Sequence, residues 1–108
     1  MDTRQERKFR RFNLEWHAHV WFPSGNAIGE VHAVTRNINQ CGLLLESPHS
    51  IPYRSLVEFT ITVRGGWISR PVEITGVGEV VRIEPCETAN GFGIAVACSE
   101  PITLMETI

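Results

Sequence analysis

Hydrophobic and polar residues alternate along most of this chain, which is the period of a β-strand rather than of an amphipathic helix. β-branched and aromatic residues are frequent in the alternating runs, while glycine, proline, asparagine and serine gather between them. No long stretch has helical spacing. The pattern therefore predicts an all-β protein with strands near residues 13–22, 27–37, 43–46, 55–64, 68–84 and 91–98.

Turn-forming residues separate these strands, and short strands joined in this way indicate a small antiparallel barrel or sandwich. We expect turns at residues 23–26, 47–52, 65–66 and 85–90. The fifth strand contains Gly76 and Gly78, and a glycine inside a strand often marks a break, a bulge or a barrel corner. After residue 98 we expect only a short C-terminal tail with at most one helical turn.

The first hairpin allows an internal test of register. If its turn is centred between Ser24 and Gly25, the two strands sort into one apolar face and one wetter face, as a half-buried sheet requires. The apolar face would pair Trp16 with Ala33, Ala18 with Val31, Val20 with Gly29 and Phe22 with Ala27. The wetter face would pair His17 with His32 and His19 with Glu30.

The same register joins two distant segments of the sequence. It places Phe12 opposite Asn37 and Arg11 opposite Ile38, at the open end of the hairpin. The segment before the first strand is rich in arginine, and the segment after the second strand is a polar turn that ends in glycine. We therefore expect a binding site where the two segments meet.

Length and composition are those of one folded domain: 108 residues, of which 43% are hydrophobic and 20% charged. The net charge of −2 is unevenly distributed. Residues 1–12 carry five basic and two acidic groups, a net of +3, whereas the rest carries five arginines and ten glutamates, a net of −5. We expect residues 1–12 to be a flexible basic arm, residues 13–98 the barrel and residues 99–108 the tail.

Nine of the ten basic residues are arginine, whose planar fork suits phosphates and purine edges. A small nucleotide fits this pattern better than a nucleic acid, which normally requires a wider basic surface and an isoelectric point above the 6.1 of this chain. A nucleic-acid partner is therefore not expected, although a barrel that binds single strands through the arm and exposed tryptophans stays a lower-ranked alternative.

Cysteine usage and the absence of long apolar runs indicate a cytoplasmic protein. The three cysteines, Cys41, Cys86 and Cys98, are an odd number without CxxC spacing, so neither a disulfide framework nor a thiolate zinc site is expected. The N-terminus is charged from residue 2, and no run approaches the ~18 residues that span a bilayer. We expect no membrane insertion.

Other chemistry-bearing residues give no stronger signal. No serine, histidine and acid group form a nucleophile and base pair, so we expect no enzyme and no catalytic residue. The histidines and Glu30 on one hairpin face have no recognised metal-ligand spacing, so we expect no metal and no cofactor. The aromatic residues Trp16, Phe22, Phe59 and Phe92 are expected in the core. Trp21 and Trp67, at less buried positions of the pattern, are lower-ranked candidates for a partner contact.

Two motifs carry a resemblance to a known family. Arg7-x-x-x-Arg11 and Asn37-x-Asn39-x-x-Gly42 resemble the two signatures of the PilZ domain family, in its order and at its spacing. Residues 78–82 and 91–96 are similar to the family's closing strands. The resemblance covers essentially the whole chain. It implies a six- to seven-stranded antiparallel β-barrel of the split-barrel type that binds the bacterial second messenger cyclic di-GMP and relays the signal to a downstream protein, without catalysis.

Carried over residue by residue, the resemblance implies ligand contacts from Arg7, Arg11, Asn37, Asn39 and Gly42. An arginine can grip the O6 and N7 atoms of guanine, stack on its face or pair with phosphate. The turn can supply short polar groups, and Gly42 would permit a left-handed conformation and a close ligand approach. Arg10 and Arg36 are further candidates, because Arg10 could replace one member of the arginine pair and Arg36 adjoins the second motif.

Asn39 departs from the family pattern, which usually has serine at this position. The asparagine amide is larger than a hydroxyl and fixed in shape, and a misplaced buried hydrogen bond costs roughly 1–3 kcal/mol. Two readings follow: a receptor for cyclic di-GMP with weakened affinity, or a PilZ-like protein interaction module that does not bind the messenger.

Overall fold

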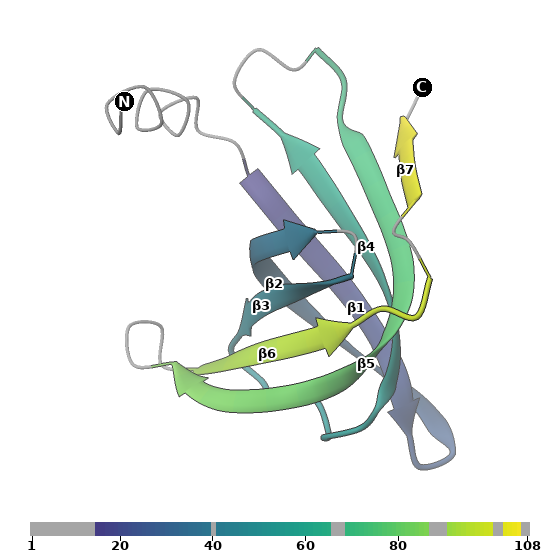
Figure 1. Cartoon of the computed structure of the whole chain (residues 1–108), viewed down its shortest axis with the longest axis vertical. Helices are drawn as coiled ribbons and strands as arrows, with labels where there is room; N and C mark the ends of the chain where they lie inside the picture. Colours follow the sequence, from purple (N-terminus) through teal and green to yellow (C-terminus); the bar gives the residue numbers. More distant parts are fainter. Residues whose placement is uncertain (1–14, 40, 66–68, 87–90, 101–102, 107–108) are drawn as a thin grey trace.

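The computed structural model describes residues 15–39, 41–65, 69–86, 91–100 and 103–106, with the backbone alone at residues 15 and 103–106 (Figure 1). This part of the chain consists of strands and connecting turns. Its strands are β1 (Glu15–Ser24), β2 (Ala27–Asn39), β3 (Gly42–Ser47), β4 (Leu56–Arg64), β5 (Val72–Cys86), β6 (Gly91–Ala97) and β7 (Thr103–Glu106). Among the described residues, no helical segment has the length and apolar character that a membrane crossing requires.

Six of the strands close into an antiparallel barrel, which confirms the expected fold class. The strand order is β4-β1-β2-β3-β6-β5, and β5 pairs back with β4. Closure depends on the length and curvature of β5, which Figure 1 shows sweeping around the barrel. The first part of β5 pairs with β4 as far as Glu79 opposite Leu56, and the second part pairs with β6 from Glu79 opposite Ala97 onward. One continuous strand thus belongs to both halves of the barrel.

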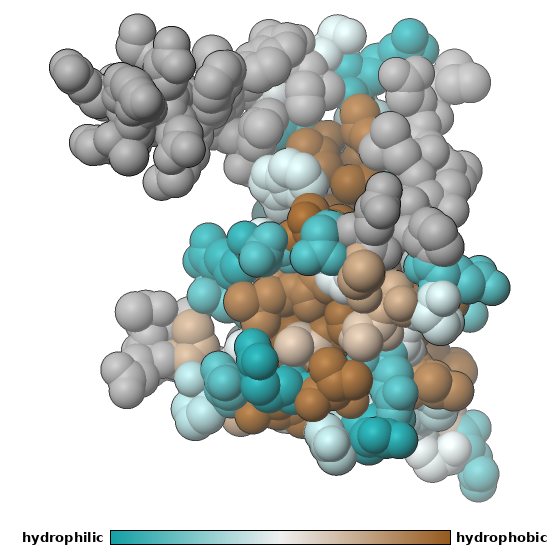
Figure 2. All heavy atoms as spheres, viewed as in Figure 1, coloured by the Kyte–Doolittle hydropathy of each residue, from teal (hydrophilic) through white to brown (hydrophobic). Residues whose placement is uncertain are grey.

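The core lies inside this barrel and is built from alternate residues of each strand, as the period of two requires. Val20, Leu45, Ile61, Val80 and Ile94 are fully buried. The expected aromatic core is also observed: Phe59 is buried, and Trp16, Phe22 and Phe92 pack partly buried against the cluster. Ile51, from the loop between β3 and β4, is fully buried as well. Figure 2 shows hydrophobic residues at the centre of this view with hydrophilic residues around them.

The observed register of the first hairpin differs from the sequence-based one by two residues. Ser24 pairs with Ala27, so the turn is formed by Gly25 and Asn26 rather than centred between Ser24 and Gly25. Gly25 has φ of 63°, which suits the first central position of a type II′ turn. A shift by two residues keeps each side chain on its face. The predicted apolar and wetter faces are therefore correct, but every predicted partner is wrong.

The corner predicted in the fifth strand is present, although the strand does not break. A Cβ on Gly76 would lie 2.6 Å from the Phe59 ring, and a Cβ on Gly78 would lie 2.6 Å from the Ala97 carbonyl oxygen. Neighbouring strands thus approach β5 closely where it passes from β4 to β6. The irregularity in pairing falls just after the glycines, between Val80 and Arg82.

The C-terminal tail differs from the expectation of at most one helical turn. Residues Thr103–Glu106 form β7, which pairs antiparallel with the start of β5, Val72 lying opposite Glu106. The expected basic arm of residues 1–12 lies outside the described residues.

Candidate ligand-binding site

A β-bulge in β2 shapes the region of the second sequence motif. Thr35 lies opposite Leu45 and Asn37 lies opposite Leu44, so Arg36 is an extra residue on the β2 side. A bulge of this kind shifts the alternation of all residues that follow it. Val31, Ala33 and Thr35 are buried before the bulge, whereas beyond it both Arg36 and Asn37 are exposed.

The shifted alternation places both asparagines of the motif on the outside. Asn37 and Asn39 are exposed, whereas Ile38 between them packs partly buried against the core. If Arg36 were an ordinary paired residue of the ladder, Asn37 would have continued the inward row of Thr35. The bulge therefore presents the two carboxamides together and still keeps an apolar anchor beneath them.

Asn39 has a local structural role in the turn between β2 and β3. Its side-chain Oδ1 accepts hydrogen bonds from the backbone N–H of Cys41 at 2.7 Å and from that of Gly42 at 3.1 Å. This is an Asx-type cap, which a serine hydroxyl also forms, though more weakly. The cap occupies the carboxamide oxygen and two backbone donors of the turn. Nδ2 of Asn39 has no hydrogen-bond partner within the described part of the chain.

Gly42 is required by strand packing, and the expectation of a left-handed conformation there is wrong. Among the described glycines, positive φ values occur at Gly25 and Gly65. A Cβ on Gly42 would instead collide with the carbonyl oxygen of Val96 in β6. The glycine of the motif thus lets the start of β3 approach the end of β6.

A hollow of about 250 Å³ lies beside this turn. Three of the five expected ligand residues, Asn37, Asn39 and Gly42, line it together with Cys41 and residues of β3 and β6. The hollow is below the usual size of a complete small-molecule pocket, so it suits one part of a larger ligand. Cys41 and the end of β6 were missed as lining residues. The position of Cys41 within the motif could have indicated it as a lining residue. The end of β6 reaches the hollow through the pairing of β3 with β6, which the sequence does not reveal.

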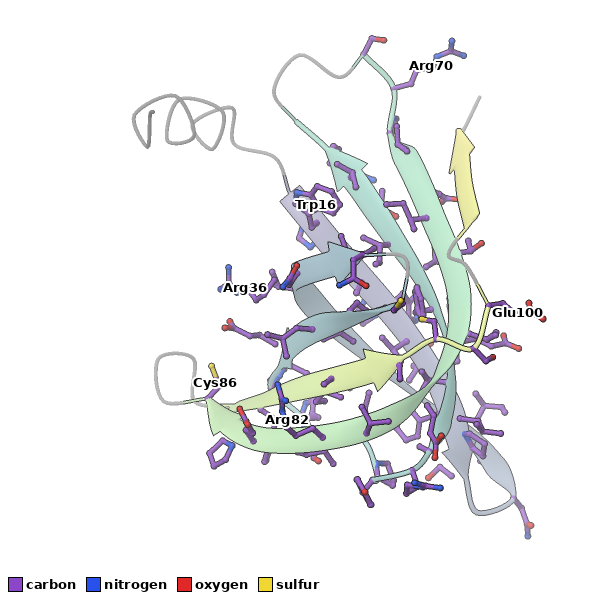
Figure 3. All side chains as sticks on the ribbon, in the orientation of Figure 1. Trp16, Arg36, Arg70, Arg82, Cys86 and Glu100 are labelled. Atoms are coloured by element: carbon purple, nitrogen blue, oxygen red, sulfur yellow. The ribbon has the colours of Figure 1, made fainter. Side chains whose placement is uncertain are left out.

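Arg36 lies beside the motif but is engaged by a neighbour. Its Nη2 lies 2.8 Å from Oε1 of Glu46 on β3, and Figure 3 shows the arginine projecting from the barrel. The hydrogen bond from Arg36 lowers the pKa of the Glu46 carboxyl below its ordinary value. As placed, Arg36 fixes the bulge to β3 and does not line the hollow at the turn.

The arginines of the first motif, Arg7, Arg10 and Arg11, lie outside the described residues. The predicted juxtaposition of Arg11 with Ile38 falls there as well. That juxtaposition was predicted from a hairpin register that differs by two residues from the register observed between His17 and Ser24. The meeting of the arm with the turn therefore stays a prediction.

The histidines of the first hairpin form a ring stack on the outer face. His19 lies directly opposite His32, with ring centroids 4.2 Å apart, and stacks on Trp21 at 4.0 Å. Nε2 of His19 is 2.7 Å from Oε2 of Glu30, and this hydrogen bond lowers the pKa of the glutamate. Within the described ranges, no three histidine, cysteine or acidic groups are arranged to hold a metal ion.

A second hollow, of about 940 Å³, is mainly apolar and shares Ala97 of β6 with the hollow at the turn. It lies between the tip of the first hairpin, the start of β4 and the corner of β5, and we call it the apolar groove. Its lining includes Trp21, Ile28, Leu56 and Val77, and Ile28 and Leu56 are 70% and 69% exposed. Trp21, a candidate for a partner contact, lines this groove, while Trp67 lies outside the described residues.

Size favours the apolar groove as a binding site, whereas polar chemistry favours the hollow at the turn. For a charged, hydrogen-bonding ligand the second criterion decides, because few polar groups line the groove.

Comparisons with models of known protein families, with curated proteins and with solved structures found no match.

Proposed function

We propose that this protein is a cytoplasmic, non-catalytic receptor for cyclic di-GMP that passes the signal to a downstream protein. The observation that carries the proposal is the grouping of Asn37, Asn39 and Gly42 around one hollow at the β2–β3 turn. These three residues belong to the motif that resembles the PilZ signature. The proposal adds to them the arginine pair Arg7 and Arg11.

The chemistry of the ligand matches these groups. Cyclic di-GMP has two phosphates and two guanines, so it needs guanidinium groups as well as short hydrogen-bonding side chains. The exposed carboxamide of Asn37 and Nδ2 of Asn39 are assigned to a guanine edge or a phosphate oxygen. Arg7 and Arg11 are assigned to the remaining phosphate and guanine surface, because the hollow alone holds only part of the ligand.

Calorimetric titration with cyclic di-GMP tests this proposal. Binding is expected in the wild-type protein and is expected to weaken roughly tenfold to a hundredfold in Arg7→Ala and Arg11→Ala, because each loses a charge-assisted hydrogen bond. Asn37→Ala should weaken it by a smaller factor.

Arg82→Ala is the matched control. Arg82 is an exposed arginine on β5, 3.2 Å from Glu84 and outside the lining of the hollow. Its replacement should leave the affinity unchanged. The proposal fails if the wild-type protein gives no binding heat at high micromolar ligand, or if both arm variants bind as tightly as the wild type.

The second candidate function is a protein interaction module that does not bind the messenger. The apolar groove favours it, because large side chains such as Ile28 and Leu56 are exposed around a hollow with few polar groups. Its proposed occupant is an amphipathic segment of a partner protein, with apolar side chains in the groove and a basic residue opposite Glu58 on its rim.

Asn39→Ser separates the two candidates. Serine keeps an oxygen that can cap the turn and replaces the amide donor by a rotating hydroxyl. A receptor weakened by Asn39 should bind cyclic di-GMP more tightly after this replacement. A module that has lost the messenger should show no binding in either form, and that result in calorimetry would favour the second function.

A further inference from the structure

Two of the three cysteines lie opposite each other where β3 and β6 meet. The last pair of the β3–β6 ladder is Gly42 with Ala97, and the ladder continues by one residue, because the backbone N–H of Cys98 donates to the carbonyl oxygen of Cys41 at 2.8 Å. Cys41 and Cys98 are therefore directly paired positions. In such a pair the Cα atoms are about 5.5 Å apart, which is within the range of disulfides.

The two thiols also share a face of the sheet. Paired residues of an antiparallel ladder point to the same side. Next along this row come Leu43 with Val96 and Leu45 with Ile94, all buried in the barrel. Cys98 itself packs partly buried against this core, whereas Cys41 is exposed at the rim.

The backbone pairing of Cys41 with Cys98 is incomplete. Such a pair can exchange two backbone hydrogen bonds. The one from the Cys98 N–H to the Cys41 carbonyl oxygen is present, whereas the N–H of Cys41 donates to Asn39 Oδ1 instead. Burial is the main cause that raises the pKa of the Cys98 thiol, and the neighbouring Cys41 contributes to it. The exposed Cys41 is therefore the first target of an oxidant, and Cys98 is the resolving thiol.

We propose that Cys41 and Cys98 form a reversible disulfide that responds to hydroperoxides. The Cys41 thiolate attacks one peroxide oxygen, an S–O bond forms as the O–O bond breaks, Cys41 becomes a sulfenic acid, and the other oxygen takes up a proton and leaves as water or an alcohol. The Cys98 thiolate then attacks the sulfenic sulfur, an S–S bond forms, and the hydroxyl leaves as water after taking up a proton. Two thiols are oxidised by two electrons, and one peroxide is reduced. A dithiol reductant restores the thiols by exchange.

The bridge would regulate the candidate ligand site, and this part of the inference rests on the proposed function. Cys41 lines the hollow beside Asn39, and the bridge would tie the turn to the end of β6. A sulfur bridge at the rim fills space that the ligand would use. Oxidation is therefore expected to weaken binding of cyclic di-GMP by at least about fivefold, the lower end of typical allosteric coupling.

Thiol counting and peptide mapping test the disulfide without any ligand. After treatment with one equivalent of hydrogen peroxide, the wild-type protein should lose two of its three thiols, and a proteolytic map should contain a peptide pair joined through Cys41 and Cys98. Dithiothreitol should reverse both changes. Cys41→Ser and Cys98→Ser should give no intramolecular bridge.

Cys86→Ser is the control, because Cys86 lies at the opposite end of β6, where it pairs with Gly91 (Figure 3). This variant should still form the bridge and retain no free thiol. Bridges between two chains in place of the intramolecular one, or any bridge through Cys86, would overturn the proposal.

Calorimetry on the reduced and oxidised forms then tests the coupling. If the reduced protein binds no messenger while the mapped bridge forms, the proposed function fails and the redox site stands. If the reduced protein binds but no bridge forms, the redox site fails and the function stands. Equal affinity in both forms would refute the regulatory link, and Cys98→Ser should bind equally well before and after peroxide.

Discussion

At the scale of single residues, one motif contains residues with different structural roles. Asn39 caps the β2–β3 turn through its carboxamide oxygen, Gly42 allows two strands to approach, and Asn37 presents an exposed carboxamide. Two of the three are thus engaged in forming the turn. For that reason, loss of ligand binding after a mutation here must be compared with the stability of the variant.

Gly42→Ala is expected to destabilise the fold by about 1–3 kcal/mol, the usual cost of overpacking. The new methyl group would collide with the Val96 carbonyl oxygen, which is backbone and cannot rotate away. Gly93→Ala is the matched control, since the nearest heavy atom to a Cβ at that position is 3.9 Å away. Urea unfolding of both variants measures the difference, and equal midpoints would contradict the packing role of Gly42.

At the scale of elements, the bulge in β2 decides which residues of the motif are exposed. Before Arg36 the inward row of β2 consists of odd-numbered residues, and after it Ile38 takes the inward position. The ion pair of Arg36 with Glu46 lies on the surface, with side-chain exposures of 55% and 21%, so its own contribution is small. The charge of Arg36 therefore contributes little to the stability of the bulge.

Deletion of Arg36 should be tolerated about as well as Arg36→Ala. The substitution removes a surface ion pair and is expected to cost less than about 1 kcal/mol. The deletion lets Asn37 follow Thr35 directly, so the ladder becomes regular, Ile38 stays inward and Asn37 and Asn39 stay exposed. Urea unfolding followed by circular dichroism compares the two. A deletion variant far less stable than Arg36→Ala would show that the fold needs the local bend and twist of the bulge.

At the scale of the whole molecule, the barrel closes through β4, which lies between β1 and β5. Phe59 occupies the middle of this seam: it pairs with Val20 on one side and with Gly76 on the other, and its side chain is 2% exposed. The ring fills the space that the missing side chain of Gly76 leaves. Closure of the barrel and filling of its core thus depend on the same residue.

Phe59→Ala is expected to cost about 3–5 kcal/mol, through lost burial and a cavity at the seam. This is a large share of the 5–15 kcal/mol typical of a whole domain. Tyr53→Ala is the matched control: it also removes an aromatic ring, but from a side chain that is 61% exposed, so less than about 0.5 kcal/mol is expected. Thermal and urea unfolding test both, and a small effect at Phe59 would mean that the seam does not limit stability.

The amino-acid sequence by itself determined the fold class, the approximate strands and the faces of the first hairpin. These depend on the alternation of apolar and polar residues, which is local and unaffected by a shift of two residues. The same insensitivity explains the register error: the apolar pattern of Ala18 and Val20 fits Val31 and Ala33 in either alignment. The observed turn places Gly25 at its first central position, which requires the positive φ, whereas the predicted turn would have placed Ser24 there.

The tertiary structure alone decided which distant residues meet. The bulge at Arg36, the collision that excludes a side chain at Gly42, and the pairing of Cys41 with Cys98 all depend on β3 lying between β2 and β6. Strand order arises from the closure of the whole barrel, and no local pattern encodes it. The sequence therefore supplied the residues of the candidate site, and the packing of the strands determined their exposure and their neighbours.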